Sequence, residues 1–149
     1  SANLTSKETY EIRKDARMFE TWESSPALRL GLGKACDYAQ KQDISKTFER
    51  IQKLGHTLRK ELEKVEDCLV HDIGKEKGGI VSFSLKGKNP IKVKEELSKR
   101  KVNTSVSYKT STFWDMEERG LGDILRASVH YYNTEEEILS FINILKCLP

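Results

Sequence analysis

Residues 124 to 137 constrain the fold more than any other stretch of this chain. Ile124 to Tyr132 is rich in apolar and β-branched residues, which predicts a strand in the core. Thr134 and Glu137 have the spacing of a capping box, in which each side chain pairs with an otherwise unpaired N–H group of the first helical turn. The helix that follows carries apolar residues on one face, so this strand and helix must both pack on a common core. Arg126 is the exception within the apolar strand.

The periodicity of the remaining chain predicts an α+β fold. Helical patterns cover residues 26–39, 43–65, 90–99 and 135–147, and strand patterns cover residues 68–73, 80–85, 102–108 and 124–132. A short extended piece is expected at residues 10–12, in a polar segment that only other protein would hold in place. We therefore predict a small, mainly antiparallel sheet with helices packed on one face.

Several single residues carry local expectations. The helix over residues 43–65 is expected to place its charged residues, Arg59 among them, on the outside. Gly31 and Gly33, within a helix, suggest close packing against another backbone. Residues 109–123 read as a loop with one helical turn, whose Trp114 and Met116 pack on the core.

Composition excludes some classes of protein and indicates a compartment. A net charge of +3 with both signs interspersed does not describe a nucleic-acid footprint. Three cysteines at wide spacings favour a reducing, cytoplasmic location, and no signal peptide or membrane span is recognisable. The chain opens on small polar residues instead of Met, which suits a fragment of a longer protein.

The cysteines suggest no metal chemistry. Cys68 and His71 have a Cys-x-x-His spacing, but a strand turns them to opposite faces and no second pair accompanies them. Cys36 and Cys68 are instead interpreted as small buried hydrophobic residues.

Five blocks of the sequence together resemble the C-terminal third of class V aminotransferase-like enzymes. They are residues 19–23, 30–33, 79–83, 115–121 and 126–138. This group contains pyridoxal-phosphate-dependent cysteine desulfurases, C–S lyases, epimerases and aminotransferases. The resemblance implies the C-terminal domain of a fold-type I enzyme, with residues 1–42 as an N-terminal segment and linking helix from a large domain and residues 43–149 as the small domain.

The resemblance also implies where the chemistry lies. The parent enzyme would be a homodimer acting on an amino acid, with no nucleic-acid or membrane partner. Its Schiff-base lysine and its contacts to the pyridoxal phosphate ring would lie upstream, in the large domain. This chain alone would then be inactive and would hold no covalently bound cofactor.

Arg126 matches the arginine that binds the substrate α-carboxylate in these enzymes. A planar guanidinium can bind a carboxylate through two parallel hydrogen bonds, which fits that role. The alternative is a partly exposed arginine, or an internal salt bridge with an acid at 115–118 or 135–137.

The segment before Arg126 bears on the type of reaction. In desulfurases that form a persulfide, a nucleophilic cysteine lies in this segment. Residues 109–125 contain no cysteine, but they do contain hydroxyl side chains, among them Ser111 and Thr112. A persulfide mechanism is therefore disfavoured, and Ser111 and Thr112 remain candidate pocket-lining residues. His130 is a third candidate, with an aromatic cluster as its alternative. Trp22-Glu23 stands where relatives often have a glycine–threonine pair near the cofactor phosphate, which argues against that contact.

Two other interpretations stay open. The chain could be a non-catalytic dimerisation or interaction module, because the resemblance implies that the cofactor lysine lies upstream of it. A nucleic-acid-binding α+β domain is disfavoured, since the aromatic residues lack the RNP spacing. The substrate amino acid and the choice among transamination, lyase and epimerisation chemistry are not determined.

Overall fold

The computed structural model describes residues 2–20 and 23–148 and divides into two compact units, Ser1–Gln42 and Asp43–Pro149. The first unit begins with an antiparallel hairpin of β1 (Ala2–Leu4) and β2 (Tyr10–Ile12), followed by the 3-10 helix η1 (Ala16–Phe19) and helix α1 (Pro26–Lys41). The extended piece at residues 10–12 is confirmed. Its partner strand was not predicted, because three residues are too short to show an alternating pattern.

Helix α1 begins as its sequence predicts. Pro26 occupies the first turn, and the Ser25 hydroxyl accepts a hydrogen bond from the N–H of Leu28. No described residue of α1 is buried, so the prediction that Cys36 is a buried hydrophobic residue is wrong. Nothing in the described chain lies within 4 Å of a Cβ atom built on Gly31 or Gly33. The close packing predicted for these glycines is therefore not made within the described chain.

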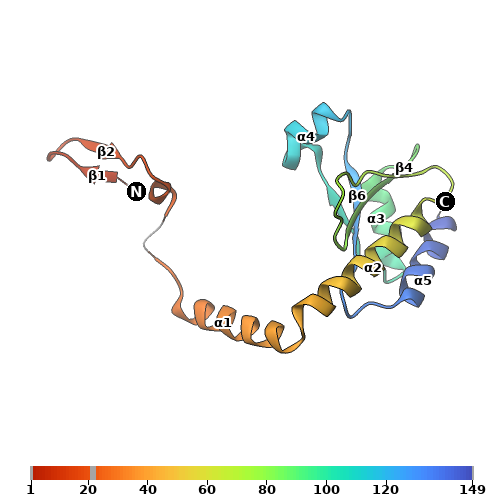
Figure 1. Ribbon diagram of the computed structural model, residues 1–149. Helices are drawn as coiled ribbons and strands as arrows, with labels where there is room; N and C mark the ends of the chain where they lie inside the picture. The colour runs from red at the N-terminus through yellow and green to blue at the C-terminus, as the bar shows by residue number, and fades with distance from the viewer. Residues whose placement is uncertain (1, 21–22, 149) are drawn as a thin grey trace. The chain divides into compact units, whose positions relative to one another are not determined.

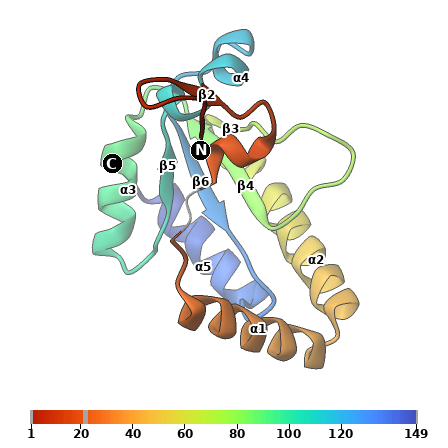
Figure 2. The same cartoon turned by 90° about the vertical axis from the view of Figure 1, so that its left-hand side faces the viewer.

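The second unit is an antiparallel sheet with three long helices on one face (Figures 1 and 2). The strand order is β3-β4-β6-β5, with β3 at Cys68–Val70, β4 at Ile80–Leu85, β5 at Ser105–Ser107 and β6 at Ile124–Ser128. The helices are α2 (Ile44–Leu62), α3 (Pro90–Lys99) and α5 (Glu135–Lys146). The predicted α+β fold is confirmed. No helix in the described ranges is long and apolar enough to cross a membrane.

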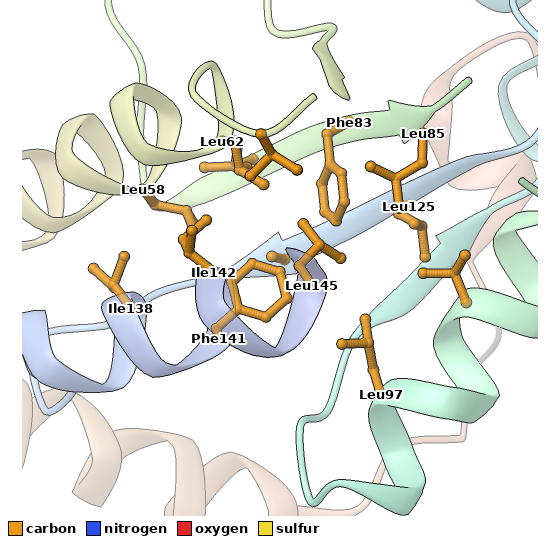
Figure 3. Packing of buried hydrophobic residues seen from close by; sticks show 14 of the residues in the cluster. Leu58, Leu62, Phe83, Leu85, Leu97, Leu125, Ile138, Phe141, Ile142 and Leu145 are labelled. Carbon is orange, nitrogen blue, oxygen red and sulfur yellow. The ribbon is translucent and has the colours of Figure 1, made fainter. Parts of the chain in front are cut away.

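The core lies between the sheet and the helices (Figure 3). Leu58 and Leu62 of α2 belong to this core together with Phe83 of β4, and the Phe83 ring packs edge to face on Phe141 of α5 at 6.2 Å between centroids. A fully buried side chain of this size contributes about 1.5–3 kcal/mol to folding. This packing leaves the opposite face of the sheet available.

Side chains cap three helices of this unit, and the predicted capping box is among them. Asp43 accepts from the N–H of Lys46, Asn89 accepts from the first turn of α3, and Thr134 and Glu137 form the capping box of α5. Strand β6 ends at Ser128 and not at Tyr132. The reason is local, because the Asn133 carboxamide oxygen accepts the N–H of His130 and closes a turn there.

The segment before β6 is partly as predicted. It forms the 3-10 helix η2 (Lys109–Thr112) and helix α4 (Phe113–Glu118). Met116 is buried, but Trp114 is 85% exposed, so the prediction that Trp114 packs on the core is wrong. The Trp114 ring contacts its neighbour Phe113 instead, at 5.8 Å between centroids.

Candidate functional site

Arg126 lies in the middle of the open face of the sheet. Its neighbours Leu125 and Ala127 point into the core, and because side chains alternate along a strand, Arg126 points to the other face. Its cross-strand partners are Ser82 on β4 and Ser105 on β5. The arginine thus stands between two small hydroxyl residues that leave room above the sheet.

The guanidinium of Arg126 is exposed and without a protein partner. Within residues 2–20 and 23–148 it makes no hydrogen bond or ion pair, so the predicted alternative of an internal salt bridge is not formed there. Asp115 pairs with Arg119 at 3.0 Å, and Glu135 pairs with Lys53 at 3.2 Å. The other alternative, an arginine exposed to solvent, agrees with the structure, and the carboxylate-binding role of Arg126 stays a prediction.

A second arginine lies where strand β4 begins and is buried. Arg59 of α2 is 7% exposed, and its Nε lies 2.7 Å from Oδ2 of Asp72. Its Nη2 donates to the carbonyl oxygens of Gly78 at 2.9 Å and Ile80 at 2.8 Å. The prediction that Arg59 covers the outside of its helix is wrong, because the loop between β3 and β4 packs over that part of α2.

Asp72 connects Arg59 to strand β4. Its Oδ1 accepts both the backbone N–H and the hydroxyl of Ser82, each at 2.9 Å. Ser82 is in turn the cross-strand partner of Arg126. A chain of polar contacts therefore runs from helix α2 to the strand residue beside Arg126.

A polar cleft of about 260 Å³ opens beside the Arg59–Asp72 ion pair. Its lining includes Arg59, His71, Asp72, Ser82 and Arg119. The His71 Nε2 lies 2.8 Å from the Ser84 hydroxyl, and burial together with nearby Arg119 lowers the pKa of His71, against the opposing effect of Asp72. His71 is thus favoured as a neutral hydrogen-bonding group.

The loop before β6 is held in place, with its hydroxyls exposed. Ser111 and Thr112 lie on η2 and face solvent. The N–H of Lys109 donates to Asp123 at 2.8 Å, and Arg119 donates to the carbonyl oxygen of His71. The role of Ser111 and Thr112 as pocket-lining residues stays a prediction.

His130 belongs to an aromatic cluster after β6. Its ring stacks on Tyr132 at 5.0 Å and lies 4.7 Å from the Tyr131 ring. Arg50 of α2 supports this turn by donating to the carbonyl oxygens of Tyr131 and Asn133, both at 2.9 Å. The cluster that was the alternative for His130 is present, and a pocket-lining role for this residue stays a prediction.

Two features of the described residues bear on cofactor and metal binding. No lysine in the described chain is buried, whereas a lysine that binds a carbonyl group covalently needs partial desolvation to be reactive. No group of three or more His, Cys, Asp or Glu among these residues could hold a metal ion. Cys68 packs on the core, and burial raises the pKa of its thiol to about 11. Of the Trp22-Glu23 pair, Trp22 lies outside the described residues.

Sequence reasoning did not find the Arg59–Asp72 pair. One signal was present: Gly55 lies four residues before Arg59 on α2, so both share one helix face. A Cβ atom on Gly55 would lie 2.6 Å from the carbonyl oxygen of Gly78. In this chain the glycine leaves space for the backbone at Gly78, and the Arg59 guanidinium binds the Gly78 carbonyl oxygen.

Comparison with known proteins agrees with this architecture. A probable cysteine desulfurase from Chlamydia trachomatis is 32% identical over 123 residues, which are 78% of this chain and 29% of that protein. The solved apo structure of a cysteine desulfurase from Thermococcus onnurineus superposes with a TM-score of 0.77 at 20% identity, covering 97% of this chain and 36% of that one. The cystine C–S lyase C-DES, solved with its product cysteine persulfide, gives 0.67 at 20% identity over 88% of this chain and 32% of that one.

This chain therefore spans about a third or less of the relatives it matches. In another solved structure of C-DES, glycine is covalently linked to the pyridoxal phosphate cofactor of that enzyme. The family match extends over residues 2–141, nearly the whole length of the chain. The chain belongs to the aminotransferase class-V family.

Proposed function

We propose that this chain is the C-terminal, substrate-closing domain of a pyridoxal-phosphate-dependent enzyme that acts on an amino acid. Residues 1–42 would be the segment and linking helix from a large domain, and residues 43–149 the small domain. The enzyme would be a homodimer, as its family resemblance implies. The unpaired guanidinium of Arg126 on the open face of the sheet carries the proposal.

Arg126 would bind the α-carboxylate of the amino acid. A carboxylate accepts two parallel hydrogen bonds from a guanidinium, which fixes its orientation as well as its position. Ser82 and Ser105 on either side are small, so a ligand could approach the guanidinium from above the sheet. Pyridoxal phosphate, when bound by the large domain, would supply an electron sink for the chemistry.

The loop before Arg126 narrows the type of reaction. Residues 109–125 contain no cysteine, and transfer of sulfur to a protein thiolate needs one. We therefore propose a lyase, transaminase or epimerase reaction without a loop persulfide. The C–S lyase among the structural relatives is a precedent for chemistry at sulfur, although its 20% identity supports only the fold.

The first prediction concerns Arg126 in the full-length protein loaded with pyridoxal phosphate. Arg126→Ala should raise KM for the amino acid about 10- to 100-fold, because hydrogen bonds to a charged group are lost. Arg126→Lys should raise it less, since the charge stays while the planar fork is lost. Steady-state kinetics on the amino acid would measure both.

Lys92→Ala is the matched control for this experiment. It removes one positive charge from α3, on the helical side of the sheet, and should leave KM unchanged. An unchanged KM and rate in Arg126→Ala would rule out the role of Arg126.

A non-catalytic interaction module is the second candidate function. It is favoured by the exposure of α1, which presents Leu28, Leu30 and Leu32 to solvent. A natural protein without any cofactor-binding domain would support this alternative and exclude the first.

A further inference from the structure

We propose that Arg59 and Asp72 are positioning residues that keep Arg126 unpaired. This inference rests on the proposed function, because an arginine that binds a substrate carboxylate must not be neutralised by a carboxylate of its own protein. Arg59 would act by holding Asp72, the acid that bonds Ser82, the cross-strand partner of Arg126.

Ser82 links Asp72 to the strand position opposite Arg126. The Ser82 hydroxyl donates to Asp72 at 2.9 Å, and Ser82 is directly opposite Arg126 in the sheet. Directly opposite residues have Cβ atoms about 4.5–5.5 Å apart, and long side chains extend beyond that to the next neighbour. A freed Asp72 carboxylate could therefore meet the Arg126 guanidinium over the small serine side chain.

In the structure both oxygens of Asp72 are already engaged. Oδ2 lies 2.7 Å from the Nε of Arg59, and Oδ1 accepts the two hydrogen bonds from Ser82. Arg59 is itself anchored by the carbonyl oxygens of Gly78 and Ile80. The side chains of Arg59 and Asp72 are only 8% and 10% exposed, so solvent screens their attraction little.

Loss of Arg59 would leave Asp72 as a poorly compensated charge that needs another cation. Arg119 in the same cleft is engaged by Asp115 and by the carbonyl oxygen of His71. Lys77 also lines the cleft, whereas Arg126 is adjacent through Ser82. We infer that Asp72 would turn to Arg126.

The test follows the reactivity of Arg126 in the 149-residue chain. Phenylglyoxal modifies arginine side chains, and an ion pair slows the reaction; peptide mass spectrometry gives the rate at Arg126 alone. Arg59→Met should slow modification of Arg126 about two- to fivefold, the effect expected of an ion pair near the surface. The double variant Arg59→Met/Asp72→Asn should return to the wild-type rate.

Arg119→Met is the matched control. It removes the same charge from the same cleft but leaves Asp72 bound to Arg59, so the rate at Arg126 should not change. A purely structural role for Arg59 predicts the opposite sign, because local unfolding would speed modification.

An unchanged or faster rate in Arg59→Met would overturn the inference, as would protection of Lys77 in place of Arg126. If Arg59→Met does not fold by circular dichroism, Arg59→Lys replaces it, since a lysine lacks the fork and holds Asp72 less firmly. In Arg59→Lys, slower modification of Arg126 remains the expected result. A wild-type rate of modification would contradict the inference. No amino acid is present in these measurements, so their failure would leave the KM test of Arg126 unaffected.

Discussion

Gly79 lies where a side chain has no space. A Cβ atom there would be 2.2 Å from the carbonyl oxygen of Val129 and 2.7 Å from Cγ2 of Ile51. The sequence shows the Gly78-Gly79 pair only as a break before a strand, and nothing in it separates the two residues. The tertiary structure distinguishes the two residues, because a Cβ atom on Gly78 would have no atom within 4 Å.

Gly79→Ala should therefore destabilise the chain by about 1–3 kcal/mol, the usual cost of overpacking. Gly78→Ala should change stability by no more than about 0.5 kcal/mol, as is usual for surface substitutions. Urea unfolding followed by circular dichroism compares the two. Equal midpoints for the two variants would contradict the close approach of Gly79 to Val129.

At the scale of elements, local sequence signals were most informative at helix beginnings. Each cap uses a side chain within a few residues of the helix it begins, so its spacing is visible without the fold. The capping box of α5 is the clearest case. The Glu137 carboxylate accepts from the Asn133 carboxamide at 3.0 Å and from the N–H of Thr134 at 3.0 Å.

These two hydrogen bonds lower the pKa of Glu137, with the bond from Asn133 as the larger cause. A depressed folded-state pKa stabilises the fold above the ordinary Glu value of about 4.3, and this contribution is lost as pH falls through the lower folded-state pKa. Wild-type chain should therefore be more stable than Glu137→Gln at pH 7. The difference in urea midpoint should disappear in acid.

Glu63→Gln serves as the control for this pH series. Glu63 is exposed at the end of α2, and its side chain makes no hydrogen bond or ion pair within the described ranges. The difference in urea midpoint between Glu63→Gln and wild type should depend on pH less than the difference between Glu137→Gln and wild type. A constant gap for Glu137→Gln from pH 7 to pH 3 would contradict a role for its charge.

At the scale of the whole molecule, the second unit has a hydrophobic core of its own, whereas the chain covers only part of the length of each relative. The core of the second unit joins the sheet to α2, α3 and α5, while no lysine in the described chain is buried. The aminotransferase class-V match and the fraction of each relative covered are the basis of the proposal that the cofactor contacts lie in another part of the protein.

Pyridoxal phosphate added to the chain should therefore give no specific lysine adduct. Exposed lysines react weakly and reversibly, since their amines are protonated and solvated at neutral pH. Borohydride treatment and peptide mass spectrometry should show no single lysine modified stoichiometrically. One lysine trapped in full yield would contradict the proposal that this chain alone is inactive.

The sequence by itself determined the order of the main helices and strands of the second unit, the capping box of α5 and the family resemblance. These depend on periodicity and on contacts a few residues apart, which the order of residues shows directly. Only the tertiary structure decided that Arg59 is buried, that Trp114 is exposed and that Arg126 has no partner in the described chain. Asp72 and Gly78 lie 13 and 19 residues from Arg59, and folding alone brings them to it.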